Sequence, residues 1–340
     1  MRTRPHLSDA DLMDALRLAY GLDITSVAFL PLGADYDTAL YRADTSGGES
    51  FFCRLRSGAW NEVAVELPAA LHAAGVPGII APLRTRDGGL SAPLGRYRVS
   101  LLPWVEARNA FEAPLSNAQW VALGAAVRRI HEAALPERLR AAIPAETFPD
   151  QWRVRLRAIM AALESTVPID ALAEGAIAGL CKHRDEVLWL LERTEALAAH
   201  ARSSSRPLVV CHTDLHAGNV LVDAAGELHL VDWDAPLRAP RERDLMYAGG
   251  GQFANDRSPD EEEALFCAGY GAAGYGDAPV DRDLLSYYRY ARIVEDLAIY
   301  VEDLLHGDPA SPDRAQALRY MLANFEPGGT LEVARAGDAV

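Results

Sequence analysis

The sequence predicts an α+β chain with two lobes: a small antiparallel sheet with one helix, then a larger and mostly helical part. Two observations predict this arrangement. Up to about residue 105, short apolar runs alternate with glycine and proline turns, which is typical of strands. Beyond that point apolar residues recur with helical spacing. With 340 residues, half of them apolar, the chain can bury a large core. We expect an N-terminal lobe at 1–102, a linker at 103–106 and a C-terminal lobe at 107–340.

The N-terminal lobe is expected to begin with a helix. Ser8 and Asp11 have capping spacing, Leu12 and Leu16 share one face, and Gly21 follows the last turn. A second helix is expected after the third strand and should stop at Gly75. The predicted elements of the sheet are strands at 25–30, 37–43, 50–56, 79–84 and 96–103, with the inserted helix at 60–74.

The C-terminal lobe is expected to consist of helices around one hairpin. Ser116 and Gln119 form a capping box for a helix through Leu135. The last dozen residues should fray. Further helices are predicted at 150–166, 170–201, 261–272, 281–305 and 312–323, and the hairpin at 208–232.

Charge and composition exclude several classes of protein. With 33 basic and 48 acidic residues, the net charge is −15, which disfavours nucleic acid as a partner and favours a cationic small molecule. Four scattered cysteines without a C-x-x-C pair indicate a reducing compartment. No run is long and apolar enough for a membrane span, and no signal peptide is visible. We therefore expect a soluble, cytoplasmic protein without a membrane partner, either a monomer or a weak homodimer.

The most informative stretch lies in the hairpin. An apolar run leads into His212-x-Asp214-x-x-x-x-Asn219, a second apolar run follows, and a third ends at Asp232. Phosphoryl transfer from a nucleotide needs these groups in this order. Asp214 would accept or orient the proton of the acceptor hydroxyl, with His212 supporting the loop. Asn219 and Asp232 would hold the Mg²⁺ that bridges the phosphates.

Two simpler explanations of this stretch remain open. His212, Asp214 and His216 alternate, so they could form a metal cluster on one side of a strand. No second group of ligands with suitable spacing is evident in the sequence. Alternatively, the polar residues beside the apolar runs could be purely structural.

The N-terminal lobe offers candidates for binding the nucleotide. The turn containing Gly33 and Asp35 precedes the second predicted strand and could lie over the phosphates, although any hairpin may use one glycine. On the third strand Arg54 occupies the place of the phosphate-bracing cation, with Arg56 on the same face. Both arginines could instead simply face solvent. Glu62 is the expected partner of Arg54, with Glu66 as second choice. The adenine is expected against the linker, at Leu101, Leu102, Trp104 and Val105.

These motifs resemble those of the aminoglycoside phosphotransferase family, which has a bilobal protein-kinase-like fold. The resemblance rests on His212-Thr-Asp214-Leu-His-Ala-Gly-Asn219, on Leu-Val-Asp232-Trp, and on Arg243-Asp244-Leu. It implies an ATP-dependent and Mg²⁺-dependent kinase that phosphorylates a hydroxyl of an antibiotic and so confers resistance. The later stretches, 232–251 and 287–300, resemble members that act on aminocyclitols such as spectinomycin. The family commonly has lysine where this chain has Arg54.

The substrate implied is a cationic aminocyclitol, and the helix predicted at 281–305 could receive it. This helix places Tyr288, Arg292 and Glu295 on one face with Asp296 beside them. Trp233 and Asp234 are further candidates. The same charges could instead form an exposed ion-pair face within the helix. Asp244 is expected to anchor its loop through backbone hydrogen bonds.

Two rival functions remain open at this point. One is a kinase of the same fold acting on choline, another amino alcohol or a different aminoglycoside. The other is a catalytically inactive homologue that binds nucleotide or drug, which the missing lysine favours slightly.

Overall fold

The computed structural model describes residues 4–32, 37–253, 257–272, 279–311 and 313–338. The chain forms two compact units, here called the sheet unit and the helical unit. The sequence predicted a single boundary between two lobes, at 103–106. In the structure, the sheet unit also includes two stretches that lie later in the chain. The sheet unit comprises Met1–Ala113, Ala126–Pro144 and Ala217–Pro236, and the helical unit comprises Pro114–Ala125, Ala145–His216 and Leu237–Val340.

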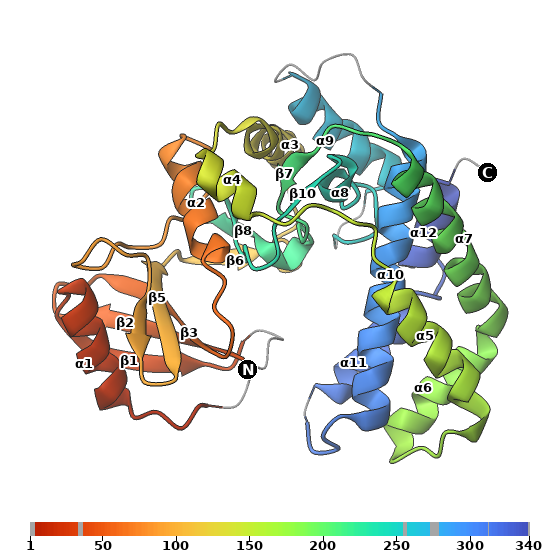
Figure 1. The fold of residues 1–340 in the computed structure, drawn as a ribbon, viewed down its shortest axis with the longest axis horizontal. Helices are drawn as coiled ribbons and strands as arrows, with labels where there is room; N and C mark the ends of the chain where they lie inside the picture. The colour runs from red at the N-terminus through yellow and green to blue at the C-terminus, as the bar shows by residue number, and fades with distance from the viewer. Residues whose placement is uncertain (1–3, 33–36, 254–256, 273–278, 312, 339–340) are drawn as a thin grey trace. The chain divides into compact units, whose positions relative to one another are not determined.

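The sheet unit contains the predicted five-stranded antiparallel sheet, in the order β1-β2-β3-β5-β4 (Figure 1). The first helix, α1, packs its buried Leu12 and Leu16 into the core of this sheet. Ser8 caps it and Gly21 ends it in the left-handed conformation, as expected. The bounds are α1 Asp9–Tyr20, β1 Ile24–Leu30, β2 Thr38–Thr45, β3 Ser50–Ser57, α2 Val63–Ala73, β4 Ala92–Leu94 and β5 Tyr97–Pro103.

Along β3, side chains point alternately into the core and away from it, and only the second set can contact a ligand. Phe51, Cys53 and Leu55 are buried in the core, because successive residues of a strand point to opposite faces. Arg54 and Arg56 therefore share the other face, as predicted.

The prediction of a strand at 79–84 was wrong. This segment forms no ladder: it makes an isolated bridge between Ile79 and Leu230 and one hydrogen bond from Leu83 to Leu101, and the sheet is completed by β4 instead. Pro82 lacks an amide hydrogen, so the segment cannot continue a ladder. The sequence of β4 is short and contains Pro93, so it looks like a turn.

The hairpin predicted at 208–232 needs correction: only β8 and β9 form it, in a three-stranded sheet of the same unit, whereas Val209–Cys211 pairs with Leu237–Ala239 in a separate ladder. β8 lies between β6 and β9, and both pairs are antiparallel. The short helix α4 packs near α2 and was not predicted from the sequence. The bounds are β6 Ala107–Asn109, α4 Glu137–Ala142, a 3₁₀ turn at Ala217–Asn219, β8 Val220–Asp223 and β9 Leu228–Leu230.

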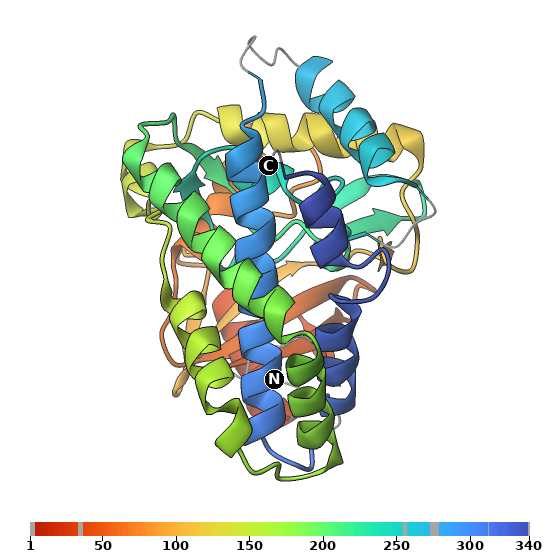
Figure 2. The same ribbon diagram turned by 90° about the vertical axis from the view of Figure 1, so that its right-hand side faces the viewer.

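The helical unit is built around α10, which contacts α5, α6, α7, α11 and α12 (Figure 2). The helix α3 begins in this unit, and the predicted capping box of Ser116 and Gln119 is present at its start. β7 and β10 form a two-stranded ladder. The bounds are α3 Asn117–Glu132, α5 Gln151–Ala162, α6 Ala171–Lys182, α7 Arg184–Ser203, β7 Val209–Cys211, β10 Leu237–Ala239, α8 Glu242–Leu245, α9 Pro259–Ala272, α10 Arg282–His306, α11 Arg314–Ala323 and α12 Thr330–Ala336.

Two helical predictions need correction. The single helix expected at 170–201 is two helices, which meet at His183, whose ring stacks on Phe325. The C-terminus contains the helix α12 rather than a frayed end, because Leu331 is buried and Arg193 pairs with Asp338. Both outcomes depend on partners distant in the sequence. Among the described residues, no helix combines the length and apolarity needed to cross a membrane.

Candidate phosphotransfer site

The hairpin of β8 and β9 brings the two predicted metal ligands to one end of an antiparallel pair. Asn219 directly precedes β8, and Asp232 follows the end of β9. The amide of Val231 donates a hydrogen bond of 3.1 Å to the carbonyl of Asn219, so the two segments are held side by side. Asp232 has φ of +69°, a left-handed conformation that is unusual for a residue other than glycine. Such strain is often retained at functional positions.

The oxygen atoms at this end suit a hard divalent cation. Mg²⁺ prefers carboxylate and amide oxygens, which Asp232 and Asn219 carry. Asp234 adds a third oxygen donor two residues further on, and its Oδ1 is buried without a hydrogen-bond partner among the described residues. A buried acceptor without a partner costs about 1–3 kcal/mol, so it requires an explanation. The donor set therefore fits a magnesium ion.

Arg54 forms an ion pair with Asp234, and this corrects the expected pairing with the helix that follows β3. Glu62 lies instead 3.6 Å from Arg98, and Glu66 lies 2.7 Å from Arg138. The helix glutamates are thus paired with other arginines of the sheet unit. Arg54, the candidate for bracing the phosphates, is therefore oriented by Asp234, in the segment that follows β9.

Asn61 strengthens the same connection. Its side-chain amide donates to the carbonyl of Asp234 at 3.1 Å, and its Oδ1 accepts from the amide of Val63 at the start of α2. The loop after β9 is therefore fixed from two sides, by β3 and by the residues before α2. The predicted phosphate turn, with Gly33 and Asp35, lies outside the described residues.

The segment expected to contact adenine needs one correction. Leu101 is fully buried in the core of the sheet unit, and its carbonyl accepts the amide of Leu83. It cannot present its side chain to a nucleotide. Leu102, Trp104 and Val105 are partly exposed, so the prediction narrows to these three residues.

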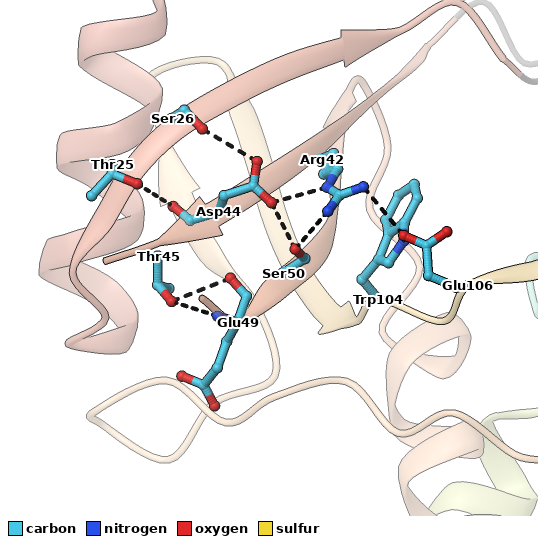
Figure 3. Close-up of polar contacts among 9 residues, drawn as sticks. All are labelled: Thr25, Ser26, Arg42, Asp44, Thr45, Glu49, Ser50, Trp104 and Glu106. Atoms are coloured by element: carbon cyan, nitrogen blue, oxygen red, sulfur yellow. Dashed lines mark hydrogen bonds and ion pairs between the residues drawn. The ribbon is translucent and has the colours of Figure 1, made fainter. Parts of the chain in front are cut away.

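Arg42 organises this segment and was missed from the sequence. As Figure 3 shows, its guanidinium bonds Asp44 and Ser50 at 2.9 Å each, and it reaches Glu106 at 3.3 Å. It also lies 4.9 Å from the ring centroid of Trp104, whose indole N–H donates to Glu106. A cation over an aromatic face stabilises both groups. Trp104, which directly follows β5, is therefore held in a fixed orientation.

In the helical unit, Asp244 holds the loop that carries Asp214. Its carboxylate accepts the backbone amides of His212 at 2.8 Å and Thr213 at 2.7 Å, which confirms the anchoring role predicted for it. Tyr247 donates to the carbonyl of Thr213 at 2.5 Å. Thr213 has φ of +78°, which is costly for a β-branched residue. These three hydrogen bonds offset that cost.

His212 supports the same loop from within. It is buried, and its Nδ1 accepts the amide of Asp214 at 3.3 Å. The bond fixes the backbone at Asp214, as expected for a supporting residue.

Asp244→Ala should destabilise the protein by about 3 kcal/mol or more, because it leaves two buried amides without an acceptor. Chemical unfolding in urea measures this loss. Asp185→Ala is the control, since Asp185 is exposed in the first turn of α7. Equal stability of the two variants would contradict the anchoring role.

Asp214 is held by a set of charged groups in the same unit. Its Oδ1 accepts from Arg292 at 2.6 Å, and the Nε2 of His216 lies 3.6 Å from its Oδ2. Arg292 also donates to Asp296 at 3.0 Å, one turn further along α10. Burial alone would raise the pKa of Asp214, but His216 and Arg292 outweigh it and hold that pKa well below its usual range. Asp214 is therefore a carboxylate at any physiological pH.

The other residues predicted to contact the substrate differ in burial and in whether they already have a hydrogen-bond or ion-pair partner. Glu295 has no hydrogen bond or ion pair with any residue that the structure describes, and burial raises its pKa against the opposing charges of Arg292 and Arg243. Tyr288 is buried beside Phe148, and its hydroxyl lacks a partner among the described residues. Trp233 is buried with its indole N–H donated to the carbonyl of Leu230. Asp234 is already paired with Arg54.

Together, the five-stranded sheet, the hairpin and the Asp214 loop define the protein-kinase-like fold of small-molecule phosphotransferases. A family model described as the phosphotransferase enzyme family matches residues 28–284. Because this match covers more than half of the chain, the protein belongs to that family.

Among solved structures, the chain is similar to spectinomycin phosphotransferase APH(9)-Ia in complex with ADP and spectinomycin. The identity is 31%, the match covers 98% of this chain and 99% of that one, and the TM-score is 0.88. An aminoglycoside phosphotransferase from Alicyclobacillus acidocaldarius shares the fold, with a TM-score of 0.64 and 16% identity over 99% of this chain and 96% of that one.

Among curated proteins, the chain is similar to protein StrN of Streptomyces griseus. The identity is 28% over 189 residues, which cover 53% of this chain and 57% of that protein. The match therefore spans little more than half of the length of this relative.

Proposed function

We propose that the protein transfers the γ-phosphoryl group of ATP to a hydroxyl of an aminocyclitol antibiotic, with spectinomycin as the acceptor. The observation that carries this proposal is the similarity over almost the whole chain to a spectinomycin phosphotransferase crystallised with ADP and spectinomycin. At 31% identity this similarity also covers the helices of the helical unit, which are the part of the chain expected to receive an acceptor.

Asp214 is proposed to orient the acceptor hydroxyl and to receive its proton. A carboxylate whose pKa is held low is a weak base, so its main contribution is orientation and the stabilisation of positive charge as the proton leaves. Arg292 keeps the carboxylate in one position, since it bonds both Asp214 and Asp296. Most of the rate enhancement should then come from positioning and charge neutralisation.

Asn219 and Asp232 are proposed to hold a magnesium ion, which when bound neutralises charge on the phosphates. The evidence for this role is the donor set at one end of the hairpin, with the unpartnered oxygen of Asp234 close by in the sequence. Arg54 would contact the phosphates from β3. Leu102, Trp104 and Val105 would contact the adenine.

The acceptor implied by this site is a cation. Spectinomycin carries two methylamino groups, and Glu295 is a carboxylate without an ion-pair partner among the described residues. A partly buried carboxylate of this kind gains more from a ligand ammonium than an exposed one does. The −15 net charge of the chain would also attract a dication. We propose Glu295 as the principal amine-binding residue.

Glu295→Gln should raise the KM for spectinomycin by about tenfold and leave kcat nearly unchanged, because it removes a charged hydrogen bond made in both ground and transition states. Since burial raises the pKa of Glu295, lowering the pH should raise the wild-type KM and leave that of the variant flat. Glu302→Gln on the same helix is the control. A pH-independent wild-type KM would contradict this role.

The deciding experiment is mass spectrometry of spectinomycin incubated with the protein, ATP and Mg²⁺. The proposal requires one added phosphoryl group on the drug and a matching release of ADP. A parallel panel should contain choline, ethanolamine and other aminoglycosides. Transfer to one of these compounds alone would identify a different acceptor, and nucleotide binding without any transfer would identify an inactive homologue. Expression in a sensitive bacterium would then test whether the protein acts in the cytoplasm to confer resistance.

A further inference from the structure

The unusual feature of the sheet unit is the partner of Arg54. In this chain an arginine stands on β3 where the resembling family commonly has lysine, and the carboxylate that pairs with it follows β9 rather than lying on α2. The two glutamates at the start of α2 are occupied by Arg98 and Arg138. Arg54 therefore takes a partner from the segment after β9, while both glutamates lie beside other arginines of the same unit.

The chemistry of the two groups explains why such an exchange can work. A guanidinium carries five N–H donors in a planar fork, so it can bond a carboxylate and a phosphate oxygen at the same time. A lysine ammonium has no such fixed geometry. Asp234 bonds Arg54 through Oδ2 only. The pairing would thus orient the fork through one of its nitrogen atoms.

The position of Asp234 is well defined by its surroundings. Asn61 holds its carbonyl, and the side chains of both Arg54 and Asp234 are largely shielded, with 17% and 32% of their areas exposed. Its Oδ1 is buried without a partner among the described residues, which lowers stability. Because its unpartnered oxygen lowers the stability of the fold, Asp234 is more easily explained by a role in binding than by a role in folding.

We infer that Asp234 is the positioning residue for the phosphate-bracing Arg54, in place of the glutamate of α2. This inference rests on the proposed function. Because Asp234 lies two residues after the proposed metal ligand Asp232, one short loop would set both the cation on β3 and the metal carboxylate. Nucleotide affinity should then depend on this loop and be insensitive to the loss of Glu62 or Glu66. The role differs from the direct contact with the drug that the sequence predicted for Asp234.

Calorimetric titration with ADP and Mg²⁺ tests the inference. Asp234→Asn should weaken ADP binding by about tenfold or more, the value of one lost hydrogen bond between charged groups. Asp234→Glu should recover part of the affinity. Arg54→Met should weaken binding at least as much, and the double variant Arg54→Met/Asp234→Asn should be no weaker than Arg54→Met alone, because Asp234 acts through Arg54.

The matched control is Asp223→Asn, which removes another carboxylate of the same hairpin, one that lies 3.0 Å from His229. It should leave ADP affinity unchanged. Thermal unfolding of each variant should show that Asp234→Asn remains folded, as the buried unpartnered oxygen predicts.

Three outcomes would overturn the inference. Glu62→Gln could weaken ADP binding while Asp234→Asn does not, which would restore the helix partner. Asp234→Asn could tighten ADP binding, which would make the ion pair a restraint that nucleotide must break. It could also raise only the KM for the drug, which would make Asp234 a substrate contact. If the wild-type protein itself bound no ADP, the proposed function would fail before this inference was tested.

Discussion

Asp214→Asn should reduce kcat by about 10³-fold while ADP binding stays close to that of the wild type. The amide has almost the same shape as the carboxylate, so the loop anchored by Asp244 should keep its conformation. What disappears is the negative charge that we propose to orient the hydroxyl and to receive its proton. Steady-state kinetics with spectinomycin and calorimetry with ADP measure the two quantities separately.

The control for this variant is Asp283→Asn, an exposed carboxylate in the first turn of α10. It should have wild-type kcat and wild-type ADP affinity. An unchanged kcat for Asp214→Asn would refute the role assigned to this residue. A loss of ADP binding together with activity would instead indicate that the loop itself had collapsed.

Arg292→Met should lower kcat/KM by about a hundredfold at neutral pH, because Asp214 loses the group that positions it. The pH profile should change as well. With the guanidinium removed, burial of Asp214 is still opposed by His216 but no longer by Arg292, so the pKa of Asp214 rises. Because Asp214 must be ionised to act, protonation then removes its function at a higher pH than in the wild type. The kcat of the variant should therefore fall as the pH is lowered from about 8 to about 5.

Two comparisons make this result specific. The wild-type profile should show no acidic limb from Asp214 over the same range, because its pKa lies well below that range. Arg292→Lys keeps the charge and should keep the wild-type pH profile of kcat, with a smaller loss of rate. Arg155→Met removes an exposed arginine that lies 3.3 Å from Glu302 and should behave as wild type. Parallel pH profiles for Arg292→Met and the wild type would argue against electrostatic control of Asp214.

The sequence was sufficient to predict the structural features around the candidate site that depend on local order. Asn219 and Asp232 flank the short hairpin of β8 and β9, which their spacing indicates, whereas Asp214 lies outside this hairpin, on a loop of the helical unit. The alternation of β3 likewise puts Arg54 and Arg56 on one face. Each of these features is settled within about twenty residues.

The parts that were wrong or missed depend on contacts between distant segments. Arg54 and Asp234 are 180 residues apart, and Arg292 reaches Asp214 across 78. The sequence does not indicate which acidic residue will pair with a given arginine. The nearest glutamate of the following helix is therefore the natural prediction for Arg54, and it is wrong. Tyr247 and Asn61 were missed for the same reason, since a tyrosine or an asparagine outside a motif has no distinguishing pattern.

The arginine on β3 also has a practical consequence for finding such proteins. Reactive ATP analogues that acylate an active-site amine are widely used to label kinases, and they depend on a lysine beside the phosphates. Lys182, at the exposed end of α6, is the one lysine side chain of this sequence. If Arg54 contacts the phosphates as proposed, a proteome-wide survey based on amine capture should pass over this protein even when nucleotide is bound.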